Sequence, residues 1–249
     1  MYISTHLKHN KKLIFMKNIV ALIPARGGSK GIKNKNIIKF KKKPLIYYSI
    51  NIAKKIRLIN EVFVSTDSLK IKKISEHYGA NVPFLRPKKY SNDKATDLQV
   101  FLHFYNWYLK VYKKKIDLIV HLRATTPIRK KNTIIRAIKC LIKQPSFSSL
   151  RSFSKSNFSP YKTWIKKKFI ASPLFKGKNG KELHSLGRQY LPKTFKHVGI
   201  VDIINPNLTL KQNSMSGKKV FFFEIDEKRE KFIDLDTKDD LKRLKVMFN

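Results

Sequence analysis

A glycine-rich, cationic segment directly after an apolar run offers the clearest chemistry in this 249-residue chain. Residues 24–31 read Pro-Ala-Arg-Gly-Gly-Ser-Lys-Gly. Glycines let a backbone approach a phosphate closely, and arginine can hold phosphate oxygens through two parallel hydrogen bonds. The pattern is neither a P-loop nor the dinucleotide-binding fingerprint. It predicts a phosphate site, with a solvated turn as the alternative. The glycines would expose backbone N–H groups, and Arg26, Lys30 and Lys35 would add positive charge.

Two aspartates near the C-terminus could hold a metal ion. The segment Asp234-Leu235-Asp236 is expected at a strand end, where both carboxylates would share one face, roughly 7 Å apart, and Leu235 would turn into the core. Mg²⁺ takes one or two carboxylates together with phosphate oxygens and waters. The pair therefore predicts a magnesium site. The alternative is that Asp236 or Thr237 only caps the last helix.

Apolar runs alternate with helical patterns along most of the chain. Strands are predicted over residues 19–23, 61–65, 82–85, 118–122, 146–152, 198–204 and 220–225. Helices are predicted after Pro44, from Asp67 or Ser68 to Tyr78, and over residues 94–112, 131–143 and 238–247. This alternation predicts an α/β fold with a mostly parallel sheet and helices on both faces. Ligands bind beyond the carboxyl ends of such strands. Residues 158–180 suggest a hairpin, within an insertion at about 155–195 that could be an oligomer contact.

The charge balance is extreme. Lys and Arg total 55 against 16 acidic residues, a formal net charge of +39. A nucleic-acid-binding protein is therefore a rival interpretation, although its basic residues should form one stripe. Here lysines occur throughout the chain, as a mutational bias towards Lys, Asn and Ile would produce. A positive field would in any case attract anionic substrates.

Several other classes are excluded or disfavoured. No window approaches the roughly 20 continuous apolar residues of a membrane helix. The single cysteine, Cys140, excludes an internal disulfide and favours a reducing, cytoplasmic setting. Residues 1–15 lack the apolar core of a secretory signal and are expected to be an extension or a misassigned start. One domain is then expected over residues 16–249.

Six ordered segments resemble the acylneuraminate cytidylyltransferase family. They are residues 24–31 with Lys35-Asn36, Ser65-Thr66-Asp67, residues 82–87, residues 125–129, residues 188–193 and residues 234–237. Each match alone is weak, but six in order are specific. The resemblance implies a Rossmann-like nucleotide-diphospho-sugar transferase fold, a homodimer, and transfer of CMP from CTP to a nine-carbon acidic sugar with Mg²⁺.

The resemblance also implies roles for individual residues. Arg26 and Lys35 would stabilise charge on the leaving pyrophosphate, and Asp236 would be the catalytic metal ligand beside Asp234. The residues implied to contact the nucleotide are Ala25, Arg26, Gly27, Gly28, Ser29, Lys30, Lys35 and Asn36, and Arg86 would lie near it. The residues implied for the acidic sugar, partly from the neighbouring subunit, are Arg123, Thr125, Lys162, Arg188 and Gln189. Independently of the resemblance, His197 is expected just before the strand over residues 198–204, near Arg188, where it could contact the sugar.

One departure from the family concerns the sugar. Members that activate sialic acid carry Gln-Pro-Thr-Ser-Pro, whereas this chain reads Arg-Ala-Thr-Thr-Pro from Arg123 onwards. In the resemblance the glutamine position faces the sugar, so an arginine favours legionaminic or pseudaminic acid over N-acetylneuraminate. The alternative is that Arg123 pairs with a carboxylate such as Asp67. Enzymes for the eight-carbon sugar Kdo match less well, because their first loop lacks Gly-Gly-Ser-Lys-Gly. A nucleotidyltransferase for another base or sugar remains a further alternative.

Overall fold

The first apolar run forms β1 (Ile19–Pro24), which pairs in parallel with β4 (Glu61–Ser65) and β5 (Leu118–His121). This computed structural model describes residues 17–29 and 31–248, so residues 1–15, expected to be an extension, lie outside the described part. The sheet continues through β9 (Phe195–Ile204), β6 (Ser149–Lys155) and β10 (Val220–Glu224) in the order β10-β6-β9-β5-β1-β4. β9 runs antiparallel to β5 and β6, while β10 runs parallel to β6. The predicted mostly parallel sheet is confirmed.

One predicted strand is wrong. Residues 82–85 form no strand, because only isolated bridges join Asn81 to Phe63 and Leu85 to Thr66. The segment runs beside the end of β4, but the residues between these two bridges form no ladder with it. The strand expected over residues 146–152 begins at Ser149 instead.

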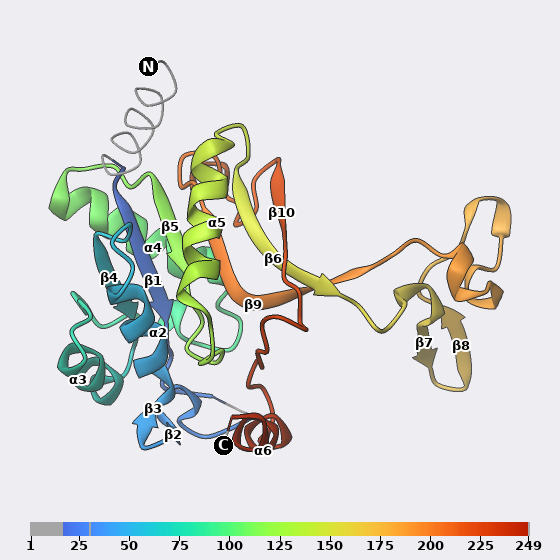
Figure 1. Ribbon diagram of the computed structural model, residues 1–249, viewed down its shortest axis with the longest axis horizontal. Coiled ribbons are helices and arrows are strands. Elements are labelled where there is room, and N and C mark those ends of the chain that lie inside the picture. The colour runs from blue at the N-terminus through green and yellow to red at the C-terminus, as the bar shows by residue number, and fades with distance from the viewer. Residues whose placement is uncertain (1–16, 30, 249) are drawn as a thin grey trace.

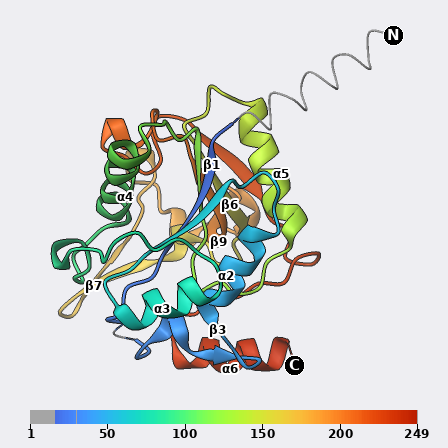
Figure 2. The same ribbon diagram turned by 90° about the vertical axis from the view of Figure 1, so that its left-hand side faces the viewer.

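Helices cover both faces of the sheet, as predicted (Figure 2). They are α2 (Leu45–Lys54), α3 (Leu69–His77), α4 (Asp97–Tyr112), α5 (Lys131–Lys143) and α6 (Lys238–Met247). Successive side chains of a strand point to opposite faces. Ile19, Ala21 and Ile23 of β1 thus pack with α2, α3 and α5, whereas Val20 and Leu22 pack with α4. β1 is buried on both sides, which explains its unbroken apolar run.

Side-chain caps fix the helix starts near the site. The Ser68 hydroxyl accepts the Ile71 N–H at the start of α3. Thr96 with Gln99, and Thr237 with Asp240, form capping boxes for α4 and α6. Of the paired alternatives left open by the sequence, Ser68 and Thr237 are therefore the caps.

Between β6 and β9 the chain leaves the sheet as an arm, which we define as residues 156–194 (Figure 1). The arm carries the antiparallel hairpin of β7 (Trp164–Lys167) and β8 (Ile170–Pro173), in the place where a hairpin was expected. A second small hairpin joins β2 (Lys39–Phe40) to β3 (Lys43–Pro44) before α2. Within residues 17–29 and 31–248, no helix combines the length and apolarity needed to cross a membrane.

Candidate active site

The loop after β1 is anchored to the end of β4 and the turn that follows it. Ala25 N–H donates to the Ser65 carbonyl at 2.9 Å, and Gly27 N–H donates to Asp67 Oδ1 at 2.8 Å. The Asn36 side-chain amide closes the loop by donating to the Arg26 carbonyl at 2.9 Å. Asp67 thus holds the glycine-rich loop, and it is neither the cap of α3 nor the partner of Arg123.

A pocket of about 450 Å³ opens beside this loop, beyond the carboxyl end of β1. It lies where the order of helices and strands predicts a ligand site. Its lining includes Arg26, Ser29, Lys35, Asn36, Arg86 and Asp236. Most residues expected to contact the nucleotide therefore meet in one place. Ala25, Gly27 and Gly28 shape the loop without lining the pocket, and Lys30 lies outside the described residues.

The pocket's cations are fixed by neighbouring groups. Arg26 Nη1 lies 2.9 Å from Asp93 Oδ1 and donates to the Asn92 carbonyl at 3.1 Å. Arg86 is buried, and its Nε donates to Ser91 Oγ at 3.1 Å. Burial lowers the pKa of Arg86. This arrangement holds preset positive charge around a small polar space, as a bound triphosphate requires.

The two aspartates do not form the predicted strand end. No strand is present over residues 231–236, because Leu235 N–H donates to the Thr125 carbonyl at 3.0 Å and the next turn caps α6. The carboxylate of Asp234 accepts from Thr126 Oγ1 and, at 3.0 Å, from Gly199 N–H. Asp236 Oδ1 instead lies 3.0 Å from Lys35 Nζ. Only Leu235 follows the expectation, since it is fully buried.

The residues implied for the sugar fall into two groups. Lys162, Arg188 and Gln189 lie on the arm, which projects away from the sheet (Figure 1), and none of them lines the pocket beside the glycine-rich loop. Lys162 Nζ donates to the His184 carbonyl at 3.3 Å. Arg188 and Gln189 line a separate pocket of about 540 Å³ at the base of the arm. Thr125, Arg123 and His197 belong instead to the sheet domain.

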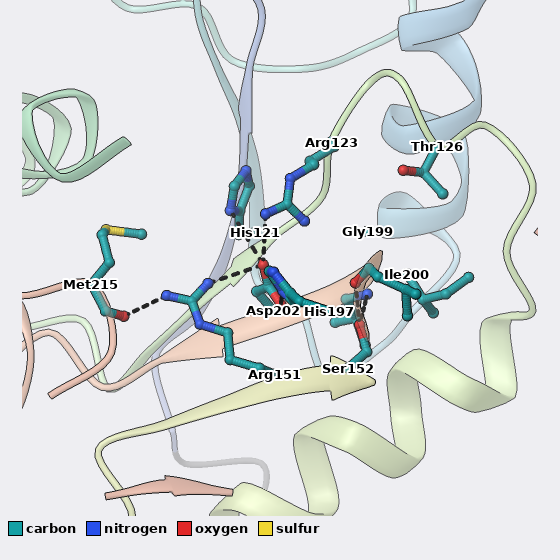
Figure 3. Close-up of polar contacts among 12 residues, drawn as sticks. His121, Arg123, Thr126, Arg151, Ser152, His197, Gly199, Ile200, Asp202 and Met215 are labelled. Carbon is teal, nitrogen blue, oxygen red and sulfur yellow. Dashed lines mark hydrogen bonds and ion pairs between the residues drawn. The ribbon is translucent and has the colours of Figure 1, made fainter. Parts of the chain in front are cut away.

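Arg123 lies two residues beyond the end of β5 and pairs with a carboxylate that the sequence did not single out (Figure 3). Its Nη2 lies 3.0 Å from Oδ2 of the fully buried Asp202. Arg151 Nη1 approaches the same oxygen at 2.9 Å, and His197 Nε2 lies 2.8 Å from Asp202 Oδ1. Although burial acts to raise the pKa of Asp202, the His197 hydrogen bond and both guanidiniums hold it well below its usual range. His197 lies within β9, not before it, and pairs with Asp202.

Sequence reasoning missed Asp202, Arg151 and the buried contacts of Arg129. Arg129 Nε donates to the Ile200 carbonyl at 2.7 Å, and its Nη2 donates to the Arg123 carbonyl at 2.6 Å. Burial lowers the pKa of Arg129 to about 9, so this guanidinium stays charged at neutral pH. An aspartate inside the apolar run of residues 198–204 was the one available signal for Asp202, because buried charges are paired.

Comparison with known proteins identifies the family of this chain. Residues 20–167 match a family model described as Cytidylyltransferase. Post-translational flagellin modification protein B of Campylobacter coli is 31% identical over 91% of this chain and 93% of its own length. A CMP-N,N'-diacetyllegionaminic acid synthase of Campylobacter jejuni is 29% identical over 94% of this chain and 96% of its own length. A pseudaminic acid cytidylyltransferase of the same species is 39% identical, but over 53% of this chain and 56% of that protein.

The fold also has a solved counterpart. A CMP:2-keto-3-deoxy-manno-octonic acid synthetase complexed with CTP superposes with a TM-score of 0.65 at 16% identity, covering 93% of this chain and 98% of that one. At this identity the likeness establishes the nucleotidyltransferase fold alone. The family model and the relatives of nearly equal length add the classification: this chain belongs to the cytidylyltransferase family.

Proposed function

We propose that this enzyme transfers CMP from CTP to the anomeric hydroxyl of a nine-carbon acidic 2-keto sugar, with release of pyrophosphate. The supporting observation is the pocket after β1, where Arg26, Lys35 and Arg86 gather beside a glycine-rich loop. Three cations around one pocket suit a triphosphate, since guanidinium and ammonium groups donate to phosphate oxygens. The relatives named for CMP-legionaminic and pseudaminic acid chemistry support both the nucleotide and the acceptor class.

In this proposal the sugar hydroxyl attacks the α-phosphorus, and the bond from that phosphorus to the β-phosphate oxygen breaks. Positioning and charge neutralisation dominate such transfers. Ser29 and the loop backbone hold the phosphates, while Arg26 and Lys35 stabilise the negative charge that grows on pyrophosphate. Asp93 and Asn92 fix Arg26 before substrate arrives, so little reorganisation is required at the moment of reaction.

Mg²⁺ fits Asp236 better than it fits the aspartate pair. Asp236 lines the pocket with a side chain that is 77% exposed, whereas Asp234 already accepts from Thr126 and Gly199. The described residues contain no group of three or more potential metal-ligating side chains. Mg²⁺ commonly takes only one or two carboxylates, together with phosphate oxygens and waters. When bound, Mg²⁺ would supply positive charge at the α-phosphate. In this arrangement Asp234 has a structural role, because it holds Thr126 and Gly199 of β9 in place.

The proposal includes a homodimer. Lys162, Arg188 and Gln189 can reach an acidic sugar at the sheet domain only if the arm of a second copy lies against it, because their own arm projects away (Figure 1). The arm exposes large apolar side chains, including Phe169 and Ile170 of the hairpin, which an interface would cover.

A nucleotide-by-sugar panel tests the function. CTP, UTP, ATP and GTP would each be paired with N-acetylneuraminate, N,N'-diacetyllegionaminate, pseudaminate and Kdo, with pyrophosphate release as the measurement. We expect turnover with CTP and at least one nine-carbon sugar. Equal use of UTP or ATP would reject the choice of CTP. Turnover with Kdo alone would reject the acceptor. Salt-sensitive DNA binding without any pyrophosphate release would favour the nucleic-acid-binding rival.

A further inference from the structure

A row of charged and polar side chains crosses three strands beside the nucleotide pocket. His121 of β5, Asp202 of β9 and Arg151 of β6 are register partners, so all three point to the same face of the sheet. Asp202 is fully buried at the centre of the row, and His121 and Arg151 are 2% and 11% exposed. A buried carboxylate in this position must be explained by its partners.

Asp202 has more cationic partners than one carboxylate can neutralise. Arg151 Nη1 and Arg123 Nη2 lie 2.9 and 3.0 Å from its Oδ2. His121 Nδ1 is 4.0 Å from the same oxygen, and burial lowers the pKa of His121 to about 4, so this ring is neutral at pH 7. Two guanidiniums against one carboxylate leave one positive charge in the row. The row therefore favours an additional anion or a strongly polar acceptor group.

Of the two guanidiniums, that of Arg123 has N–H groups left over for a ligand. Arg151 uses Nη2 to donate to the Met215 carbonyl at 2.7 Å, so its guanidinium is held between Met215 and Asp202 (Figure 3). Within residues 17–29 and 31–248, the Arg123 guanidinium has Asp202 as its only partner, and this side chain is 28% exposed. A guanidinium carries five N–H donors, so most of those of Arg123 are free to bind a ligand.

Arg123 is also held at its other end, beside the nucleotide pocket. Its carbonyl accepts from Ser49 Oγ at 3.0 Å and from Arg129 Nη2 at 2.6 Å. The preceding residue, Leu122, donates its N–H to the Leu22 carbonyl of β1, two residues before Pro24 of the pocket lining. The backbone carbonyl and the guanidinium of Arg123 are thus both held in place, close to the glycine-rich loop.

We infer that Asp202 is a positioning residue that fixes Arg123 as a receptor for a carboxylate or acyl oxygen of the acceptor sugar, and so sets which sugar is used. The inference rests on the proposed function. An acceptor matched to this site offers hydrogen-bond acceptors rather than hydroxyl donors to Arg123. Replacing the positioning carboxylate leaves Arg123 present but no longer held, which raises the KM for the sugar without affecting the nucleotide pocket.

The experiment compares wild type, Asp202→Asn, Arg123→Gln and the double variant in steady state with CTP and the three nine-carbon sugars. We expect Asp202→Asn to raise KM for the best sugar about tenfold or more, since hydrogen bonds to charged groups contribute about 1.5–3 kcal/mol. KM for CTP should stay within about twofold of wild type, because neither Asp202 nor its ion-pair partners line the nucleotide pocket. In the Arg123→Gln background, Asp202→Asn should have little further effect on KM for the sugar, because its partner is gone.

Glu230→Gln is the matched control. Glu230 is also a buried carboxylate, but it accepts from Lys130 N–H and Thr133 Oγ1 at the start of α5, so its loss should lower stability and leave both KM values unchanged. Additive effects of Asp202→Asn and Arg123→Gln, or an equal rise in KM for CTP, would overturn the inference. If Asp202→Asn does not fold, Arg123→Gln and Arg123→Lys decide, because an unchanged sugar ranking in both also overturns it. Absence of CTP-dependent turnover in wild type would instead reject the proposed function.

Discussion

Lys35 Nζ lies 3.0 Å from Asp236 Oδ1. This ion pair joins the turn just after the glycine-rich loop to the segment before α6, 201 residues further along the chain. The backbones meet here too, because a Cβ atom at Gly31 would lie 2.8 Å from the Asp236 carbonyl oxygen. The Asp236 side chain is 77% exposed, and exposed ion pairs add little to stability. The pair is therefore better explained by the chemistry of the pocket than by folding.

Asp236→Asn should lower kcat by about 10²–10³, a common cost of losing a charged group where charge develops. The melting temperature should hardly change, because the lost carboxylate is exposed. Steady-state kinetics over a Mg²⁺ series, together with thermal unfolding, would measure both effects. Near-normal turnover with unaltered Mg²⁺ dependence would show that the residue only shapes the turn before α6.

Asp234→Asn should have the opposite profile. Asp234 accepts from Thr126 Oγ1 and from Gly199 N–H, and an amide can retain only one of these contacts through its oxygen. The free energy of unfolding should fall by about 1–3 kcal/mol, the cost of leaving a buried donor unsatisfied. Urea denaturation measures this directly. Wild-type stability combined with a loss of turnover as large as that of Asp236→Asn would make Asp234 a direct metal ligand.

Two glycines of the loop differ in how closely they pack, so replacing each with alanine should have different effects. Gly31→Ala places a methyl group against the Asp236 carbonyl oxygen, so the loop must move and both stability and turnover should fall. Gly28→Ala meets no atom within 4 Å, and Gly28 does not line the pocket, so the melting temperature and KM for CTP should both stay near the wild-type values. The comparison needs thermal unfolding with and without CTP, and CTP titrations of both variants. An unchanged KM for CTP in Gly31→Ala, whose residue lines the pocket, would place the triphosphate elsewhere.

Local pattern was enough for much of the fold. The continuous apolar run of β1 and the glycines after it mark a buried strand and the loop that follows it without any tertiary information. Ser68 and Gly79, with φ of +80°, mark the ends of α3 equally well. These signals are local because a cap or a left-handed residue acts within one turn.

Features set by strand register could not be predicted in this way. Asp234-Leu235-Asp236 alternates like a strand, yet the Thr125 carbonyl takes the Leu235 N–H, and the two carboxylates find different partners. Asp202 meets Arg151 and Arg123 only because β9 lies between β5 and β6 in one register. Neither neighbour is close to Asp202 in the sequence, so no spacing rule points to the cluster.

His121 should make the stability of this protein depend on pH between about 4 and 6.5. Burial, and next the Arg123 guanidinium, lower its pKa to about 4, against about 6.5 in an unfolded chain. Between these values the unfolded state binds a proton that the folded state does not, so the free energy of unfolding falls as pH falls, by up to about 1.4 kcal/mol per pH unit.

Asp202 belongs to the same row as His121, but its titration lies outside this pH range. Its pKa lies below the usual range in the folded state, so its contribution is present above the unfolded value of about 3.9 and is lost only at more acidic pH. His121→Phe keeps a ring against Phe101, whose centroid is 4.9 Å from that of His121, and cannot take up a proton. Urea denaturation of both proteins from pH 4.5 to 7.5 should give curves that diverge towards acid, with the variant losing less stability. The remaining histidines are common to both proteins and cancel in the difference, so parallel curves would mean that His121 is protonated as readily in the folded chain as in the unfolded one.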